Sequence, residues 1–510
     1  MTIASGLRAR RTCTVAKAAP LAVLLAALQG CAALSGAPDG VRSVGAGLAG
    51  HAVCSGAFVA GRAPGTVFDA DVQPLSRVTA ILDVSVDTDA RTATGRAPGV
   101  APRTARWLSG RGCVLDAPAT AVATPPAPAR PSPRDAPWPA GDRAVDAADG
   151  GPRVDTAALR RALDAAFVGA GDPVRANARA VAVVHAGRLL VDRGAAGFEP
   201  GTPLHGWSMT KTLVAMLADR MAADGRIDLA APVVVAAAGP REPAWLAAWR
   251  ADARARITVE DLLRMRDGLD HVEDYGAAGS VARMLYGHAD VAAFAAAAPV
   301  AAPAGERWRY LSASTNLLSR VLRVRFPDDA SYLAAPHAEL LEPIGARTVT
   351  VGTDLDGTFV GSSFGWASAA DWARLGELTR LDGRWGARQV LAPGWLARAS
   401  RPARPDGEGR GYGAQVWRIG DAVAGRCRGR GLPEDTLAMQ GYGGQIVAIV
   451  PSREAVVVRL GYAFDRRTFD ECGFVADVLS ALHRRADAAT PRRAPPDATR
   501  AGSRRPPGRA

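Results

Sequence analysis

The stretch HGWSMTKTL, residues 205–213, places a serine and a lysine three residues apart, at Ser208 and Lys211. Residues with this spacing lie on one face of a helix, so the Lys211 amine can reach the Ser208 hydroxyl. Serine is a poor nucleophile unless a base takes its proton, and lysine serves as that base only if its pKa is lowered. The apolar residues that follow at helical spacing predict a buried helix that supplies the necessary desolvation: Met209, Leu213, Met216, Leu217 and Met221.

Lysine is rare in this chain, which makes its use at this position informative. Lys17 and Lys211 are the only two lysines, and the other 60 of the 62 basic residues are arginine. The structural alternative is a helix-capping serine beside a solvated lysine. Arginine would serve equally well as a solvated cation but cannot accept a proton at neutral pH. The use of lysine at this position therefore favours a catalytic role. The Ser208 N–H, at the helix N-terminus, could in addition stabilise an oxyanion.

The elements around this motif predict how it is positioned. A helix with an Asp cap is expected over 155–167, a β-hairpin over 178–194, and a long helical region over roughly 208–380. Strands return at 413–420 and in a second hairpin over 444–461, followed by a helix near 468–484. Strands at both ends with helices between them predict one antiparallel sheet assembled from the two ends of this region.

Three motifs in this order resemble those of the penicillin-recognising serine hydrolases, which include class A and C β-lactamases, DD-peptidases and related esterases. Ser-x-x-Lys opens a helix at 208–211, Tyr-x-Ser follows at 310–312, and 442–444 stands where the family has Lys/His-x-Gly. Over about 151–485 the chain is most similar to the class C-like branch with 6-aminohexanoate-dimer hydrolase and related carboxylesterases. The resemblance implies an α/β (α+β) fold of the β-lactamase/transpeptidase type, with an antiparallel sheet flanked by helices and an inserted all-helical region.

The resemblance also implies roles for individual residues. Ser208 would be the nucleophile, and Tyr310 would share the proton network with Lys211, unless it is only a packing tyrosine. Ser312 would orient Lys211 or the substrate, unless it only caps a helix. Tyr275, in the sequence EDYG, matches a tyrosine that closes over substrate in the aminohexanoate-hydrolysing relatives; the alternative is a surface loop residue.

Further substrate-binding candidates flank these motifs. Trp207 and Trp308 either line the substrate pocket or pack in the core. A backbone N–H at the third motif would complete the oxyanion hole, and its glycines would leave a strand edge open to the acyl group. The candidates there are Tyr442, Gly443, Gly444 and Gln445.

The third motif departs from the family pattern in a way that bears on substrate. No lysine or histidine precedes Gly443, whereas a cation at this place helps hold the substrate carboxylate in β-lactamases and DD-peptidases. We therefore expect a hydrolase of small esters or simple amides that works through an acyl-enzyme, without metal or cofactor. The alternatives are a β-lactamase or DD-peptidase proper, and a non-catalytic cell-envelope binding protein on the same fold.

The charge of +12 does not indicate a nucleic-acid partner. Residues 1–30 carry four basic and no acidic residues, and 483–510 carry eight arginines against two aspartates, so the rest of the chain has a net charge of only +2. A region with so little net charge lacks the positively charged surface that binds nucleic acid.

The chain is expected to have five regions. Residues 1–30 have a basic stretch followed by a short apolar run and are typical of a signal peptide. LQGC resembles a lipoprotein processing site, which would attach the chain to a membrane through a lipidated Cys31; ordinary secretion and an uncleaved anchor are the alternatives. Next come a small β-rich module (31–115), a linker rich in proline (116–150), the hydrolase domain (151–485) and a disordered basic tail (486–510).

Export to a periplasmic or cell-envelope location would place the cysteines in an oxidising compartment. Four remain after Cys13 and Cys31 are set aside, and they allow three pairings. Cys54 and Cys113 both fall in the N-terminal module, and Cys427 and Cys472 both fall late in the main domain, so we prefer these pairs. Four free buried thiols are the alternative.

Overall fold

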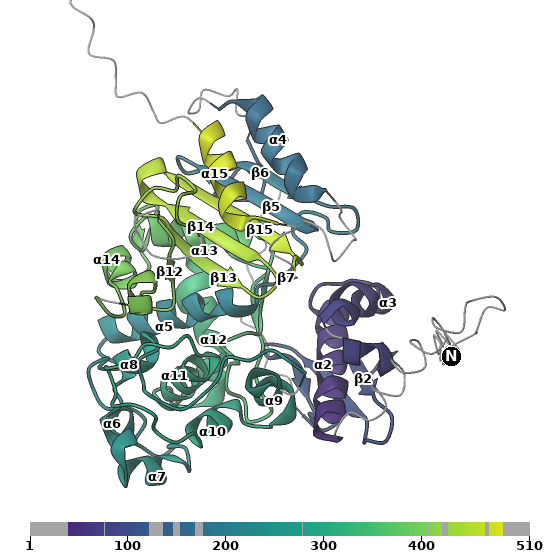
Figure 1. The fold of residues 1–510 in the computed structure, drawn as a ribbon, viewed down its shortest axis with the longest axis vertical. Coiled ribbons are helices and arrows are strands. Elements are labelled where there is room, and N and C mark those ends of the chain that lie inside the picture. The colour runs from purple at the N-terminus through teal and green to yellow at the C-terminus, as the bar shows by residue number, and fades with distance from the viewer. Residues whose placement is uncertain are drawn as a thin grey trace, which may run out of the picture.

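The computed structural model describes residues 39–75, 77–121, 136–145, 154–168, 177–277, 279–405, 407–420, 427–464 and 469–482. The predicted signal segment, Cys31 and the tail 486–510 lie outside these residues. Within them, no helix is both long enough and apolar enough to cross a bilayer. An N-terminal part, residues 39–121, lies beside a larger part that starts at 154 (Figure 1).

A six-stranded antiparallel sheet organises the larger part (Figure 1). Its central pairing joins β15 to β5, with Val457 opposite Val183, so the two ends of this region meet in one sheet as the sequence predicts. The expected strand 413–420 is reduced to two residues. In sheet order the strands are β12 (Trp417–Arg418), β13 (Leu437–Gly441), β14 (Gln445–Val450), β15 (Ala455–Gly461), β5 (Ala178–His185) and β6 (Arg188–Gly194).

Both faces of this sheet are covered by helices. Successive residues of a strand point to opposite faces, and accordingly Val181 and Val183 pack with α4 (Thr156–Phe167) and α15 (Glu471–Ala481). On the other face α13 (Ala369–Arg380) packs on β14 and β15, where a Cβ at Gly376 would lie 2.7 Å from Val456. The predicted opening helix is confirmed with its cap, since the Asp155 side chain accepts from Ala158 N.

The helical region below the sheet holds α5 (Thr210–Ala223), which begins with a 3-10 turn at Trp207–Met209. A short three-stranded sheet, in the order β7-β9-β8, crosses beside this turn. Its strands are Leu204–His205, Gly365–Ala367 and Thr350–Val351. The other helices are α6 (Val233–Ala236), α7 (Leu246–Arg250), α8 (Val259–Leu263), α9 (Ser280–Gly287), α10 (Val291–Ala296), α11 (Ser312–Val324), α12 (Asp329–Ala335) and α14 (Trp395–Ser400).

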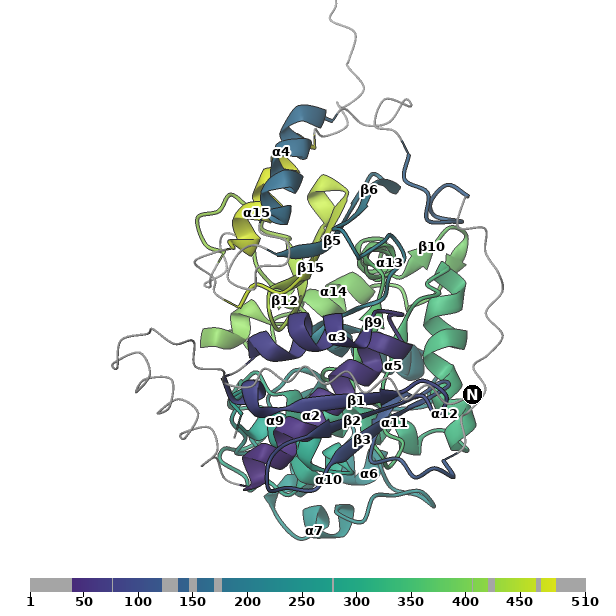
Figure 2. The same ribbon diagram turned by 90° about the vertical axis from the view of Figure 1, so that its right-hand side faces the viewer.

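The N-terminal module differs from the expected β-rich unit, because it begins with the 20-residue helix α2 (Asp39–Phe58). Residues 57–62 end this helix and form the turn after it. The sequence of α2 consists largely of small residues and has no clear apolar stripe, because α2 is buried on several sides, between a sheet and α9. Figure 2 shows the strands of the module crossing in front of α2. They are β1 (Asp83–Asp87), β2 (Thr92–Arg96), β3 (Arg103–Leu108) and β4 (Gly112–Leu115).

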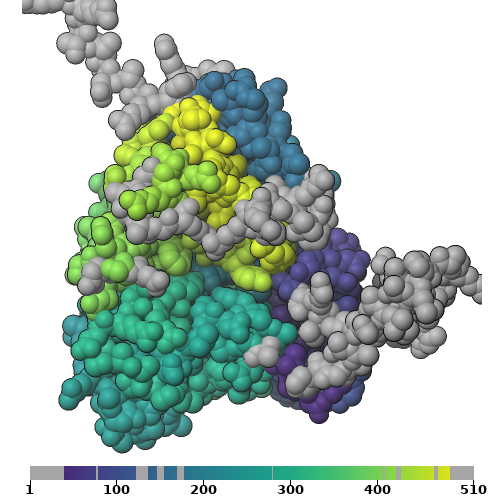
Figure 3. Space-filling model, in the orientation of Figure 1, coloured from purple at the N-terminus to yellow at the C-terminus, as the bar shows by residue number. Residues whose placement is uncertain are grey.

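The module packs as a lobe against the larger part (Figure 3). Val44 of α2 belongs to the main hydrophobic core, and the His51 ring stacks on Phe364 with centroids 4.0 Å apart. The Asp71 carboxylate is buried between Arg62 and Arg179, with 2.6 Å to the Arg179 guanidinium. These contacts join the two parts through both apolar and ionic packing.

Both expected cysteine pairs are present as disulfides. Cys54 of α2 is joined to Cys113 of β4, and Cys427 is joined to Cys472 of α15. The first bond links the helix of the module to its sheet, and the second ties the segment before β13 to the last helix.

Candidate functional site

The nucleophile position is built on an unusual backbone conformation. Trp207 has φ of +50°, which is costly for a residue with a large side chain. Its ring is held by stacking on His205, with centroids 4.2 Å apart, and by a 3.2 Å hydrogen bond from Nε1 to the Tyr462 hydroxyl. Gly206 has no room for a side chain, because a Cβ there would lie 2.2 Å from the Trp372 ring. Surrounding packing thus fixes a strained turn that presents Ser208 at the start of a helix.

Lys211 is buried and fully engaged, as the Ser-x-x-Lys spacing predicts. Its Nζ lies 3.0 Å from Ser208 Oγ, 3.0 Å from Ser312 Oγ and 2.9 Å from the Ser362 carbonyl oxygen. Only 1% of Lys211 is exposed, and burial lowers its pKa from the ordinary value to about 8, although the negative charge of Glu273 opposes the shift. A substantial fraction of the amine is therefore neutral near physiological pH and can accept the Ser208 proton.

Glu273 is a site residue that the sequence analysis did not select. Its carboxylate accepts hydrogen bonds from the backbone N–H of Ser312, at 2.7 Å, and from the Ser312 hydroxyl, at 2.6 Å. An anion at the first residue of α11 is favoured by the helix N-terminus. Because the Ser312 hydroxyl donates to Glu273, its lone pairs face the Lys211 ammonium. Ser312 therefore connects the carboxylate to the lysine.

The Tyr275 side chain lies closer to Ser208 than a residue that only closes over the substrate would need to lie. Its hydroxyl donates to Glu273 at 2.9 Å, lies 3.5 Å from Ser312 Oγ and also interacts with the Ser208 side chain. Burial, followed by the negative charge of Glu273, raises the pKa of Tyr275 well above its ordinary value. The group therefore stays protonated and does not act as an anionic base.

Tyr310 faces Lys211, as the second motif predicts, but through its ring. Lys211 Nζ lies 5.1 Å from the centroid of the Tyr310 ring. The same ring stacks on Trp417, at 5.1 Å, and meets Tyr412 edge-on at 5.7 Å. Tyr310 is thus both a packing residue and a neighbour of the base, and its catalytic role stays a prediction.

The third motif forms the turn between β13 and β14. Gly443 and Gly444 have φ of +78° and +84°, a conformation that favours glycine. A Cβ at Gly443 would lie 2.8 Å from the Tyr462 ring. We expected these glycines to keep a strand edge open, whereas the turn itself and its close packing already require them.

This turn is held against the nucleophile. A Cβ at Gly441 would lie 2.2 Å from the Gly206 carbonyl oxygen, and the Tyr442 ring meets Trp207 edge-on with centroids 5.4 Å apart. The approach brings the start of this turn close to Gly206, two residues before Ser208. That a backbone N–H of 442–445 completes an oxyanion hole with the Ser208 N–H stays a prediction.

Two predicted binding residues have other contacts. The Gln445 side chain, 2% exposed, bonds Gly461 through both its amide oxygen and its amide nitrogen, so it braces β14 against β15. Trp308 packs against Tyr412 and Trp417 in the same cluster as Tyr310, which agrees with the core-packing alternative.

A buried cation lies behind the third motif. The Arg459 guanidinium is fully buried and donates to the carbonyls of Gly444, at 2.9 Å, and Gly461, at 3.0 Å. Burial lowers its pKa to about 9. Arg459 therefore stabilises the turn from within the protein, whereas the cation of the usual third motif faces the substrate.

Comparison with known proteins places this geometry in a family. The model of the Beta-lactamase family matches residues 163–469, which is more than half of the chain. The chain belongs to the beta-lactamase family. As a member of this family it is a serine hydrolase, and the matched region contains Ser208, Lys211, Tyr310 and the third motif.

One solved structure supports the same fold for this beta-lactamase-family chain, and two others are similar to it at lower scores. A penicillin-binding protein homologue from Caulobacter crescentus aligns with a TM-score of 0.50 and 18% identity, covering 65% of this chain and 99% of that one. A family VIII carboxylesterase aligns at 0.49 and 16%, covering 65% and 98%. A protein from Bacillus anthracis described as a 6-aminohexanoate-dimer hydrolase aligns at 0.46 and 18%, covering 61% and 81%. A search of curated proteins found no match.

Proposed function

We propose that this chain hydrolyses small esters or simple amides through an acyl-enzyme formed on Ser208. The observation that carries the proposal is the 3.0 Å contact between Ser208 Oγ and a buried Lys211 amine with lowered pKa. Neutral Lys211 takes the Ser208 proton as Oγ attacks the carbonyl carbon. The resulting oxyanion is stabilised by the Ser208 N–H and an N–H of the 442–445 turn.

The proton must then reach the leaving group. Lys211 carries it after the attack, and the Tyr275 and Tyr310 side chains border the same space. Collapse of the tetrahedral intermediate breaks the bond to the leaving group, which departs with the proton. Water then attacks the acyl-enzyme, with neutral Lys211 again accepting a proton. Glu273 takes no proton in this scheme; it orients Ser312 and Tyr275, which in turn hold Lys211 and Ser208.

The surroundings of the third motif favour esters over β-lactams. A β-lactam carries a carboxylate, whose desolvation must be offset by a positive partner. Tyr442 stands where the family has lysine or histidine, and Arg459 is fully buried behind the turn. An ester needs only the nucleophile, the base and the two oxyanion donors.

The test combines labelling with turnover. A fluorophosphonate should modify Ser208, and the same preparation should show a higher kcat/KM for p-nitrophenyl acetate than for nitrocefin, by about tenfold, because the β-lactam carboxylate has no charge-assisted partner. Nitrocefin turned over tenfold faster would replace the proposal with a β-lactamase. Labelling without turnover of any ester or amide would indicate a binding protein.

We also propose that the protein is exported and attached to a membrane through Cys31. The basic and apolar N-terminal sequence and the two disulfides support an oxidising compartment. Replacement of Cys31 by serine should move the protein from the membrane fraction to the soluble fraction. An unchanged distribution would contradict lipid attachment at this residue.

A further inference from the structure

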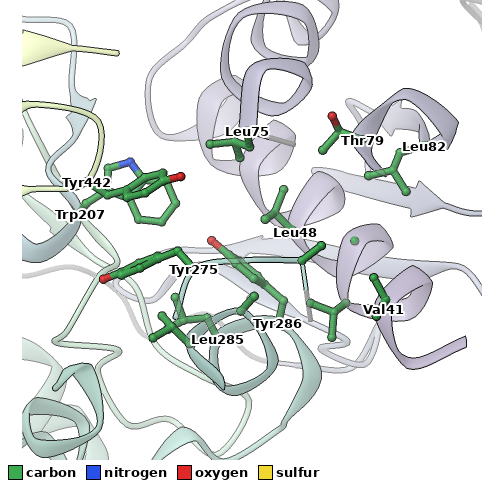
Figure 4. A pocket seen from close by; sticks show the side chains of 15 residues that line it. Val41, Leu48, Leu75, Thr79, Leu82, Trp207, Tyr275, Leu285, Tyr286 and Tyr442 are labelled. Atoms are coloured by element: carbon green, nitrogen blue, oxygen red, sulfur yellow. The ribbon is translucent and has the colours of Figure 1, made fainter. Parts of the chain in front are cut away.

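A cavity lies between the N-terminal module and the active site. One wall comes from the module, with Val41 and Leu48 of α2 and Leu82. A second wall comes from α9, including Leu285. Figure 4 shows these side chains converging from different elements on one space.

The cavity reaches residues that contact or adjoin the nucleophile. Trp207, the neighbour of Ser208, lines it together with Tyr275 and Tyr442. The Tyr275 and Tyr442 rings are stacked, with centroids 4.9 Å apart and planes inclined by 12°. The Tyr275 hydroxyl interacts with Ser208 while its ring faces the cavity. Trp207 and Tyr442 lie at one end, and Val41 and Leu82 lie at the other (Figure 4).

The chemistry of the lining defines what can bind. Within the part of the chain that the structure describes, every residue lining this cavity is aliphatic, aromatic, glycine or threonine, and none carries a charge. A cavity lined almost entirely by apolar groups suits an apolar ligand. A charged group placed there would lose its hydration without gaining an ionic partner.

We propose that this cavity holds the apolar group of the substrate, so that the preferred substrates are esters or amides with an alkyl or aryl chain longer than acetate. The inference rests on the proposed function and assigns the N-terminal module a role as one wall of the substrate site. Elsewhere the module is attached to the larger part by hydrogen bonds: Arg111 donates to Thr353 at 3.0 Å and to the Asp354 carbonyl at 3.0 Å.

Gly45 of α2 offers a direct test, because it lines the cavity. A Cβ at Gly45 would make only ordinary contacts, 3.5 Å from the nearest atom of Leu82. Gly45→Leu therefore places a side chain in the cavity, and its Cβ requires no shift of the backbone. Gly40→Leu is the matched control, since it lies on the same helix, has nothing within 4 Å of an added Cβ and does not line the cavity.

The experiment measures kcat/KM on the full chain for two series: p-nitrophenyl esters with acyl chains of increasing length, and acetate esters of alcohols of increasing length. Wild-type kcat/KM should rise about fourfold per methylene over the first additions in one series, which also identifies the side of the ester that enters the cavity. Gly45→Leu should lower the octanoate-to-acetate ratio, or its counterpart in the alcohol series, at least tenfold, and Gly40→Leu should leave it unchanged.

Leu48→Ala enlarges the same cavity and should move the preferred chain length upward, which keeps the test decisive if Gly45→Leu does not fold. Flat chain-length dependence in both series, with acetate hydrolysed normally, would overturn the cavity assignment alone. An enzyme that hydrolyses no ester or amide would overturn the proposed function itself.

Discussion

The two sides of the Tyr275–Tyr442 pair differ completely in composition. On the side of Lys211, the amine, the Ser312 hydroxyl and the Glu273 carboxylate form a continuous chain of hydrogen bonds. On the other side, the cavity lining that the structure describes carries no charge. The groups that would react with the substrate are therefore polar and hydrogen-bonded, whereas the groups proposed to select the substrate are apolar. Changes on the polar side should alter the rate for all substrates alike, and changes on the apolar side should alter which substrate is preferred.

The largest effect is expected from removal of the nucleophile. Ser208→Ala should abolish turnover of acetate and octanoate esters alike, because the other hydroxyl on Lys211, that of Ser312, donates its proton to Glu273. Stability should change little, since Lys211 keeps Ser312 and the Ser362 carbonyl as partners. Ester turnover and the midpoint of thermal unfolding check this; retention of most ester hydrolysis would remove Ser208 as nucleophile.

The second largest effect is expected from replacement of the base, Lys211. Lys211→Arg keeps the charge but cannot accept a proton near neutral pH, so kcat/KM should fall by about 10³-fold or more. The fall should be equal for short and long acyl chains if the polar and apolar sides are separate. An arginine enzyme that works nearly as well as the wild type would reduce Lys211 to a structural cation.

Glu273 should have an intermediate effect. Glu273→Gln removes a carboxylate that accepts two hydrogen bonds from Ser312, and we expect a loss of about 10- to 100-fold in kcat/KM. The negative charge of Glu273 raises the pKa of Lys211, so its removal should also shift the pH profile toward lower pH. A purely structural role would lower the rate without moving the profile. Asp274→Asn is the control, being the neighbouring exposed carboxylate.

The smallest effect concerns pH. Burial lowers the pKa of Lys211 to about 8, and the neutral amine is the active form, so kcat/KM should rise with pH through a midpoint near 8. Between pH 7 and pH 9 the increase should be about tenfold. The profile should have the same shape for acetate and octanoate esters. A profile that falls over this range would assign the base to a different group.

Parts of this arrangement can be predicted from the sequence because they depend on local periodicity. The Ser208–Lys211 contact follows from helical spacing, and the hairpin 178–194 follows from two apolar runs around Ala186-Gly187, whose φ values are both positive. Their order along the chain is enough to predict the shared antiparallel sheet.

Other parts depend on contacts between distant segments. Glu273 precedes Tyr275 by two residues, and side chains at this spacing share a face in an extended chain. This spacing is a sequence signal that places Glu273 beside the candidate Tyr275. The role of Glu273, however, depends on its contact with Ser312 at the N-terminus of α11, which the sequence does not reveal. The apolar pattern of the sequence does not predict helix α2, because its small residues are buried on several sides and form no apolar stripe. The cavity could not be predicted, since three separate segments form its walls.

The scarcity of lysine has a practical consequence for measuring this enzyme. Lys211 is the only lysine beyond residue 17, so protein grown with side-chain carbon-13 lysine carries at most two labelled amines. Cleavage of the predicted signal would leave one. Its chemical shift, followed against pH, would report the protonation state of the candidate base directly, without assignment and without substrate. The ionisation of this buried amine can therefore be followed as an isolated nuclear magnetic resonance signal.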